Sequence, residues 1–214
     1  MKEKVETESP RGFWRAREPL ILASKSLGRR LVLQQTGIPF IARPADIDER
    51  NLEAEILASG GGPDGVVLAL ASAKALAVSR ENAGAYVLGA DQAASCEGQI
   101  FGKPEDLAAA ERQLRFLSGR RHRLHSGLAL AQDGKVVFEA VSWADLTMRP
   151  LGEEFIAAYL ATVGEATLGC AGAYQIEGLG AHLFSAVEGD HWTILGLPLL
   201  QALEALRCEG ALIG

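Results

Sequence analysis

Blocks of apolar residues alternate with polar ones along the first part of the chain and predict strands and helices in turn. Residues 20–23 are an apolar run with the length of a buried strand. Residues 27–36 carry apolar side chains at helical spacing, and Gly37 supplies a stop signal. This stretch therefore predicts a strand, a short polar turn and a helix.

A second segment of this kind follows a flexible connector. The connector is rich in glycine and proline at residues 59–64. A strongly apolar helix is predicted for residues 66–78, where Lys74 is the only charged residue. A strand at residues 86–90 then leads into Asp91.

Turn signals are frequent in the second half of the chain. Glu97-Gly98 predicts a turn between short strands, and a helix is predicted to open at Lys103-Pro104 and to end at Gly119. The remaining predictions are strands at 123–131 and 135–148 joined at Asp133-Gly134, a helix at 151–163, a loop-rich segment at 165–180, a hairpin of strands at 181–187 and 191–195, and a last helix at 197–207.

Helices and strands alternate but hairpins intrude, which predicts an α/β protein with a mixed sheet and flanking helices. Residues 1–18 are charged and mixed, and we expect a loose extension ahead of a single domain at residues 19–214. This N-terminal segment lacks the apolar core of a secretory signal, and no stretch of 18 apolar residues follows it. We therefore expect a cytoplasmic protein with no membrane partner.

Composition narrows the function classes. The 214 residues are 48% apolar and 22% charged, as in an ordinary globular protein. With 27 acidic against 21 basic side chains, the net charge of −6 argues against a nucleic-acid partner and leaves open a small polyanion in a local basic pocket. The three cysteines, at positions 96, 170 and 208, stand in no metal-binding spacing and fit a reducing compartment.

Candidate chemistry lies at the ends of apolar elements. Ser24, Ser26 and Arg29 stand where a strand gives way to a helix, and the free backbone N–H groups of a helix N-terminus favour an anion. The alternative is that Ser26 only caps the helix while Arg29 is a solvated surface charge.

Two carboxylates and two lysines are further candidates. Asp91 would lie at the carboxyl edge of a sheet, where α/β proteins bind ligands, or would only form a turn. Glu49 belongs to an acidic cluster that could hold a hard cation, or to a solvated face. Lys74 either extends to water or reaches into a site. Lys103 is either a rigid phosphate contact or an ordinary exposed lysine.

Glu177 lies among glycines. Glycines on either side of this residue would let the backbone approach a ligand closely. The alternative is a glycine-rich surface loop without a binding role.

These signals occur together and in one order, and residues 20–210 resemble the Maf family of nucleoside triphosphate pyrophosphatases. The motifs that carry the resemblance are Leu22-Ala23-Ser24-Lys25-Ser26-Leu27-Gly28-Arg29-Arg30, Asp46-Ile47-Asp48-Glu49, Ala73-Lys74-Ala75, Gly89-Ala90-Asp91, Gly102-Lys103-Pro104, Leu117-Ser118-Gly119, Ala171-Gly172-Ala173-Tyr174 and Gly196-Leu197-Pro198-Leu199.

The resemblance implies a two-lobed α/β fold related to inosine triphosphate pyrophosphatases, with the nucleotide in a cleft between the lobes, and a homodimer. It also implies hydrolysis of the α–β phosphoanhydride of a nucleoside triphosphate to a nucleoside monophosphate and pyrophosphate, with Mg²⁺ or Mn²⁺. A triphosphate brings about four negative charges that must be neutralised before a nucleophile approaches.

The resemblance also assigns each polar residue a role. Glu49 and Asp91 would hold the metal, and Asp91 would orient or deprotonate the attacking water. Together with Lys74 and Lys103 they form the implied catalytic set. The residues that would bind the phosphates are Ser24, Ser26, Arg29, Lys74 and Lys103.

Recognition of the base differs between two branches of the family. Gln92, Cys170 and Glu177 resemble the branch that acts on 7-methyl-GTP, whereas Gly28 departs from it, because that branch has a tryptophan there. The carboxylate of Glu177 can accept both the N1–H and the N2–H of guanine, while a glutamine would offer the donor and acceptor that uracil or thymine needs. Gln92 and Glu177 are therefore the candidates for base recognition.

Several functions stay open at this point. The resemblance favours an enzyme that removes non-standard nucleotides such as 7-methyl-GTP. The alternatives are a pyrophosphatase for dTTP and UTP and a nucleotide-binding regulator of cell division without turnover, a role suggested by the older family name, septum formation inhibitor. A further alternative is an inactive scaffold, in which the loop that contains Gly28 no longer positions the phosphates.

Overall fold

The computed structural model describes residues 12–214, and the chain divides into two compact units. Unit 1 comprises the described residues up to Asp91 together with residues 126–142 and 195–214. Unit 2 comprises residues 92–125 and 143–194. Each passage between the two units up to residue 143 falls inside a long strand, so no separate linker joins them there.

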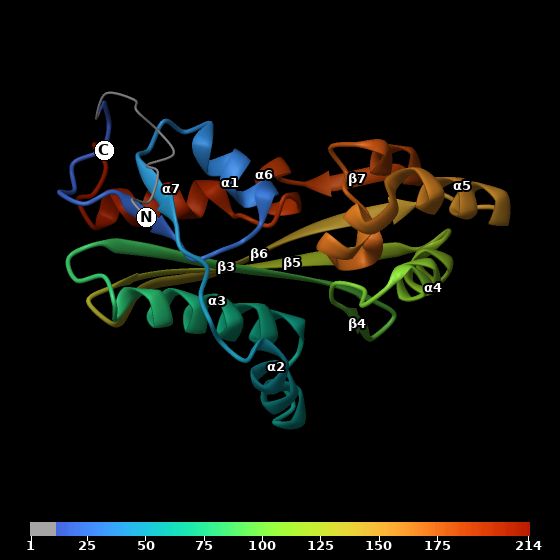
Figure 1. Ribbon diagram of the computed structural model, residues 1–214, viewed down its shortest axis with the longest axis horizontal. Helices are drawn as coiled ribbons and strands as arrows, with labels where there is room; N and C mark the ends of the chain where they lie inside the picture. The colour runs from blue at the N-terminus through green and yellow to red at the C-terminus, as the bar shows by residue number, and fades with distance from the viewer. Residues whose placement is uncertain (1–11) are drawn as a thin grey trace. The chain divides into compact units, whose positions relative to one another are not determined.

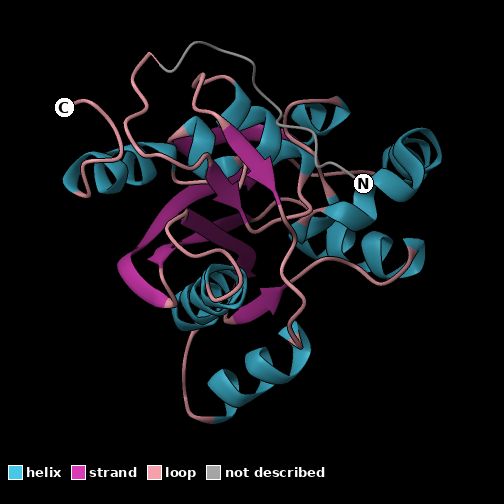
Figure 2. Cartoon of the chain, turned by 60° about the vertical axis from the view of Figure 1, so that its left-hand side comes forward, coloured by secondary structure: helices cyan, strands magenta, loops and turns pink. Residues whose placement is uncertain are grey.

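The described chain contains both helices and strands, interspersed along its length, as Figures 1 and 2 show. The strands form a mixed sheet in the order β2-β1-β3-β5-β6-β7, with β4 paired to β3, which confirms the predicted α/β class. The elements are β1 (Leu20–Leu22), α1 (Leu27–Gln34), β2 (Phe40–Ala42), α2 (Glu49–Ala58), α3 (Pro63–Ser79), β3 (Tyr86–Cys96), β4 (Gln99–Phe101), α4 (Leu107–Leu117), β5 (Arg121–Gln132), β6 (Lys135–Met148), α5 (Glu153–Val163), three 3-10 segments (Gly164–Gly169, Ala171–Ala173 and Leu179–Leu183), β7 (Phe184–Gly189), α6 (His191–Ile194) and α7 (Leu199–Cys208).

Unit 1 is built on three parallel strands. β1 lies between β2 and β3, with Leu20 opposite Phe40 and Leu22 opposite Leu88. These four side chains are fully buried. Helix α3 covers one face of the strands while α1 and α7 cover the other (Figure 1). Cover on both faces explains why the strands are continuous apolar runs rather than alternating patterns.

Helix α3 packs directly on the strands at two glycines. A Cβ atom at Gly89 would lie 2.1 Å from the carbonyl oxygen of Ala71, and one at Gly127 would lie 2.3 Å from that of Val67. Only glycine permits such contact between backbones. Gly89 therefore fixes the distance between α3, which carries Lys74, and β3, which carries Asp91, and Gly127 fixes the distance between α3 and β5.

Unit 2 has its own core. Helices α4 and α5 pack against each other, and their apolar side chains join those of β6 and of the 3-10 segments. Leu114, Leu117, Leu146 and Ala173 are completely buried there.

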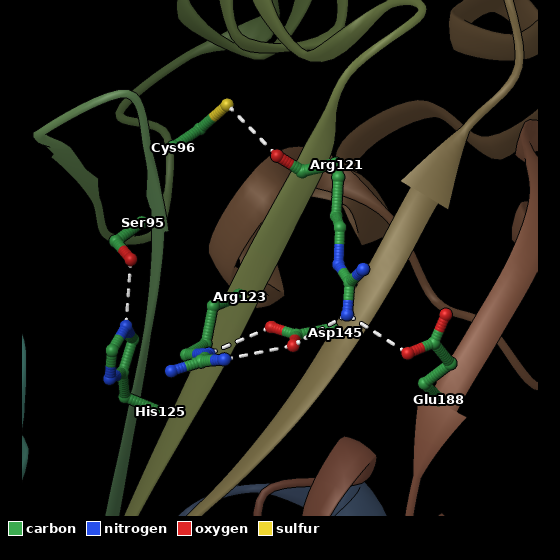
Figure 3. A network of polar contacts seen from close by, with 7 residues as sticks. All are labelled: Ser95, Cys96, Arg121, Arg123, His125, Asp145 and Glu188. Carbon is green, nitrogen blue, oxygen red and sulfur yellow. Dashed lines mark hydrogen bonds and ion pairs between the residues drawn. The ribbon is translucent and has the colours of Figure 1, made fainter.

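A charged network links three strands of unit 2 (Figure 3). Arg123 donates to both oxygens of Asp145 at 2.7 and 2.9 Å. Arg121 donates to Asp145 at 3.0 Å and to Glu188 at 2.9 Å, so the network runs from β5 over β6 to β7. Chiefly because of the hydrogen bond from Arg123, the pKa of Asp145 is lowered to about 2.

The N-terminal extension differs in part from the sequence expectation. Trp14 is only 3% exposed and forms a bridge with Leu212. Arg15 N–H donates to the carbonyl of Ala211 at 2.8 Å, and Ile213 N–H donates to that of Phe13 at 3.0 Å. Residues 13–15 are therefore not loose, because a large aromatic side chain is buried there. Residues 1–11 lie outside the described part of the chain.

The predicted hairpin at residues 181–195 is wrong. Strand β7 pairs antiparallel with β6, with Ala144 opposite Gly189, and residues 191–194 form helix α6. The Asp190 carboxylate accepts hydrogen bonds from the N–H groups of Trp192 and Thr193 and so starts that helix. The pairing of β7 with the distant strand β6, together with the Asp190 cap, therefore outweighed the local pattern that predicted a second strand at residues 191–195.

One boundary and two short elements also differ from prediction. Helix α4 begins at Leu107, where Asp106 is the N-cap, and not at Lys103-Pro104. Strand β2 and helix α2 were not predicted. Both are short and depend on neighbours, since β2 needs β1 as a partner. Within residues 12–214, no helix combines the length and the apolar character needed to cross a membrane.

Candidate active site

The ammonium group of Lys74 joins two carboxylates in unit 1. Its Nζ donates to Asp91 Oδ1 at 2.7 Å and to Glu49 Oε2 at 2.8 Å. The lysine side chain is only 9% exposed, against 14% for Asp91 and 51% for Glu49. The alternative in which Lys74 extends to water is therefore wrong. The buried ammonium group of Lys74 therefore brings the carboxylates of Asp91 and Glu49 close together.

Asp91 owes its position to the unequal lengths of neighbouring strands. Strand β1 ends at Leu22, which lies opposite Leu88. β3 continues past that point to Cys96, and Asp91 lies in this longer part of β3, three residues beyond Leu88. Asp91 therefore lies inside a strand, so the predicted strand end at Ala90 and the turn alternative are both wrong. It nevertheless stands just beyond the carboxyl end of the parallel strands, where α/β proteins bind ligands.

Glu49 is brought to Lys74 by a helix that the sequence did not reveal. It is the first residue of α2, and Asp48 caps this helix by accepting the N–H of Asn51 at 3.1 Å. Two neighbouring acidic residues thus have different roles: Asp48 caps the helix, and Glu49 forms an ion pair with Lys74. The alternative of a merely solvated face does not hold for Glu49, although half of its side chain is exposed to solvent.

Arg29 is a buried residue that connects three segments of unit 1. Its Nε donates to the carbonyl of Gly196 at 2.8 Å, and its Nη1 donates to the carbonyl of Ala90 at 2.7 Å and to Ser24 Oγ at 3.2 Å. The alternative of a solvated surface charge is therefore wrong. By holding the residue that precedes Asp91, Arg29 also fixes the backbone from which the catalytic candidate projects.

The two serines occupy the turn before α1. Ser26 is the N-cap, and its Oγ accepts the N–H of Arg29 at 3.4 Å, which confirms the capping interpretation. Ser24 is buried, and its Oγ accepts the N–H of Ser26 at 3.2 Å. The N-terminus of α1 is thus held by side chains close to Arg29, and its helix dipole favours an anion.

The other candidates lie on separate elements of unit 2. The Gln92 amide donates to the carbonyls of Thr193 and Ile194 at 3.0 and 3.1 Å. Lys103 is exposed on the loop between β4 and α4. Glu177 is exposed in a turn that follows the second 3-10 segment. The structure thus brings Ser24, Ser26, Arg29, Glu49, Lys74 and Asp91 together in unit 1, whereas Gln92, Lys103 and Glu177 belong to unit 2.

Comparison with known proteins decides the family. The family model described as Maf-like protein matches residues 19–209, which include every candidate site residue. The chain belongs to the Maf family. The ordered series of short motifs that indicated this resemblance is therefore confirmed.

Curated relatives match almost the whole Maf chain. A protein of Nitrobacter winogradskyi named nucleoside triphosphate pyrophosphatase is 49% identical over 92% of this chain and 96% of its own length. One of Rhodopseudomonas palustris with the same name is 52% identical, covering 94% and 98%. A protein of Brucella abortus named 7-methyl-GTP pyrophosphatase is 48% identical, covering 91% and 98%. Among solved structures, a HAM1 protein from Coxiella burnetii covers 89% of this chain and 98% of its own, with 15% identity and a TM-score of 0.47, which is too low to establish a shared fold.

The carboxylate pair of this Maf protein fits a divalent cation that a substrate helps to bind. Mg²⁺ in nucleotide sites commonly takes one or two carboxylates and completes its coordination with phosphate oxygens and water. Glu49 and Asp91 supply two such carboxylates at one point. Within residues 12–214 there is no group of three or more His, Cys, Asp or Glu side chains suited to a metal. Two carboxylates are within the number that such a shared site uses.

Sequence reasoning missed the backbone groups on which the site depends. The carbonyls of Ala90 and Gly196 hold the Arg29 guanidinium. Gly196 stands in one of the family motifs, yet the motif gives no hint of this contact. Carbonyl acceptors carry no residue-specific signal, so only the fold reveals them.

Proposed function

We propose that this Maf protein hydrolyses the α–β phosphoanhydride of a nucleoside triphosphate and releases a nucleoside monophosphate and pyrophosphate. The contact of Lys74 with both Glu49 and Asp91, together with the hydrogen bond from Arg29 in the first turn of α1 to the Ala90 carbonyl, carries the proposal. Family membership and the names of the relatives support it. The chemistry requires a carboxylate next to positive charge, because water must be activated where phosphate charge is neutralised.

The residues of unit 1 have distinct roles in this proposal. Asp91 orients the attacking water and accepts its proton. Lys74 keeps the Asp91 side chain in place before the substrate arrives and contributes positive charge to the phosphates. Ser24 and Ser26 present the N-terminus of α1 to a phosphate. Arg29 adds positive potential and holds the backbone before Asp91.

Glu49 and Asp91 would hold the divalent cation, Mg²⁺ or Mn²⁺. When bound, this ion would neutralise phosphate charge and stabilise the charge that develops on the leaving pyrophosphate. Lys103 would make a further phosphate contact. We also propose a homodimer in the cytoplasm, without a nucleic-acid or membrane partner, as the family resemblance and the composition suggest.

Pyrophosphate release decides between the candidate functions. The substrates are 7-methyl-GTP, GTP, UTP, dTTP and ATP, each with Mg²⁺ or Mn²⁺, and the control is Asp91→Asn. Turnover that is lost in the control supports the enzyme. Absence of turnover with intact nucleotide binding would favour a regulator of cell division.

Selectivity among bases is proposed to depend on Glu177, with 7-methyl-GTP as the preferred type of substrate. Its carboxylate has only acceptors to offer, which suits the N1–H and N2–H donors of guanine. In this proposal Gln92 fixes the backbone at Thr193 and Ile194 in the same unit. The relative named 7-methyl-GTP pyrophosphatase supports the proposal.

The substitution Glu177→Gln tests this assignment. We expect the ratio of kcat/KM for 7-methyl-GTP to that for UTP to fall, because an amide offers both a donor and an acceptor. An unchanged ranking of substrates would remove Glu177 from base recognition while leaving the hydrolytic activity as it is.

A further inference from the structure

A buried pair of polar side chains in unit 2 has no part in the proposed reaction. His122 on β5 is 2% exposed and Tyr174 is 4% exposed. His122 Nε2 and the Tyr174 hydroxyl lie 2.7 Å apart and form a hydrogen bond. The ring of Phe184 contacts both rings, so the bond is enclosed by aromatic side chains.

Both partners are uncharged at neutral pH. Burial lowers the pKa of His122 to about 4 and raises that of the Tyr174 hydroxyl far above its usual range. The bond therefore joins a neutral imidazole and a neutral phenol. Stability alone does not require it, because two apolar side chains of similar shape would fill the same space at little cost.

Tyr174 is also held tightly by its own segment. A Cβ atom on Gly172 would lie 2.6 Å from the Tyr174 ring, so this glycine packs against the ring face to allow close contact. Gly172 has φ +79°, and Ala173 has φ +64°, a conformation that residues other than glycine rarely adopt. The backbone before Tyr174 thus keeps a costly conformation, which persists only where surrounding contacts enforce it.

The turn that carries Glu177 starts directly after Tyr174. Gly178 N–H donates to the carbonyl of Gln175 at 3.3 Å, which makes Glu177 the third of four residues in a β-turn. A Cβ atom on Gly180 would lie 2.2 Å from that same carbonyl oxygen, so the turn also packs against the next 3-10 segment. Only one residue separates the anchored Tyr174 ring from the residue pair at the tip of the turn.

We propose that His122 is a positioning residue for base selectivity, which acts through the Tyr174 hydroxyl to fix the turn that presents Glu177. The inference rests on the proposed function in assigning Glu177 to the base. His122 itself touches no substrate. In this proposal, His122 sets the direction of the Glu177 carboxylate, which must accept hydrogen bonds from two donors of the base at once. A small displacement of that carboxylate would lower the activity toward the preferred base.

The test compares His122→Leu, Tyr174→Phe and the double variant with a matched control. The control is Tyr86→Phe, which removes another buried tyrosine hydroxyl, the one that donates to the carbonyl of Glu209 at 3.0 Å in unit 1. Each single variant at the pair leaves a buried polar atom unpaired and should lower Tm. The double variant removes both polar atoms, so its Tm should return toward that of the wild type.

Two further measurements separate positioning from mere structural support. In the double variant, hydrogen exchange at the Gly178 amide should be about tenfold faster, and the ratio of kcat/KM for 7-methyl-GTP to that for UTP should fall about tenfold. kcat for UTP should stay close to the wild-type value. His122→Gln, whose amide can reach the hydroxyl from a similar distance, should keep most of the selectivity. Tyr86→Phe should change neither quantity.

An unchanged Gly178 exchange rate in the double variant would overturn the inference, whether or not the protein is active. The inference would also be overturned if kcat/KM fell equally for all substrates, so that the ratio of kcat/KM for 7-methyl-GTP to that for UTP stayed unchanged. Faster exchange in a protein whose wild type hydrolyses no triphosphate would instead support the link from His122 to the turn and reject the proposed function.

Discussion

At the scale of single residues, the site depends on charge balance around Lys74. Two carboxylates close to one another repel, and the ammonium between Asp91 and Glu49 offsets that repulsion. The lysine is buried, so water screens these interactions less than it would at the surface. The same positive charge is available to a phosphate when the substrate binds. Lys74 therefore serves both the free protein and the proposed reaction.

Replacement of this lysine should stop the reaction without unfolding the protein. For Lys74→Met we expect pyrophosphate release to fall at least about a hundredfold, since a buried group that stabilises developing charge is lost. Steady-state assays on the best substrate measure the effect, and circular dichroism verifies the fold. Lys135→Met, at an exposed lysine, is the control. Activity close to that of the control would show that Lys74 has no catalytic role.

The same variant should bind a divalent cation more tightly in the absence of nucleotide. The Lys74 ammonium occupies the carboxylate oxygens that a cation would use, so its removal leaves Glu49 and Asp91 without their shared partner. Titration calorimetry with Mn²⁺ should give a lower Kd for Lys74→Met than for the wild type. The double variant with Asp91→Asn should reverse this gain. An equal or higher Kd in the single variant would show that the two carboxylates do not share a cation site.

At the scale of elements, the contact between α3 and β3 sets the geometry of the site. Gly89 lies two residues before Asp91, and Ala71 and Ala75 flank Lys74 on α3. These small residues let the two backbones touch. Any enlargement of this interface must move the helix away from the strand, and with it the ammonium away from the carboxylate.

A single methyl group at Gly89 should therefore destabilise the protein. For Gly89→Ala we expect a loss of about 3 kcal/mol in the free energy of unfolding, because the new Cβ would overlap the carbonyl of Ala71. Urea denaturation measures this loss. The matched control is Gly102→Ala, where the new Cβ would meet no other atom within 4 Å. Equal stability of the two variants would contradict the close packing of α3 on β3.

The charged network of unit 2 acts on the same scale. Arg121, Arg123, Asp145 and Glu188 connect three strands, because Arg121 on β5 contacts both Asp145 on β6 and Glu188 on β7 (Figure 3). The arginine side chains are about half exposed, so each contact is partly screened by water. The main effect of this charged network is to fix the register in which β7 pairs with β6.

At the scale of the whole molecule, acid should destabilise the fold through the buried His122. His122 in the folded protein takes up a proton only near pH 4, whereas in the unfolded chain it does so near its ordinary value of 6.5. The unfolded chain therefore binds more protons between these values, and stability is lost as the pH falls from 6.5 to about 4. The contribution of this one group is at most about 3 kcal/mol. The stability from Asp145, whose pKa is lowered, disappears at still lower pH, between its ordinary value of 3.8 and about 2.

The variant with His122→Leu and Tyr174→Phe should lose much of this dependence on pH. Between pH 7 and pH 4.5, its free energy of unfolding should decrease less than that of the wild type, because the buried imidazole of His122, which resists protonation, is absent. Urea denaturation at both pH values gives the comparison. His182→Gln, at an exposed histidine, should keep the wild-type slope. Parallel pH profiles for wild type and double variant would contradict the assignment to His122.

The pattern of residues along the chain was enough to predict the class of fold, most of the elements and the family. Apolar runs and glycine or proline stops are local signals, so they place β1, α1, α3, β6 and α7 to within a few residues. It also named each polar residue of the site, because the short motifs occur in one order that matches the Maf family.

Tertiary structure alone decided which of these residues meet and what they meet. That Lys74 is buried between two carboxylates, and that Arg29 binds the carbonyls of Ala90 and Gly196, depends on segments far apart in the chain. The pairing of β7 with β6 also overruled a local hairpin pattern. Local sequence patterns indicate which backbone conformation a segment prefers and which of its residues are buried. Which charged group meets another, and which strand pairs with another, depends instead on the distances between elements. Those distances come from the packing of the whole chain, as the contact of α3 with Gly89 shows.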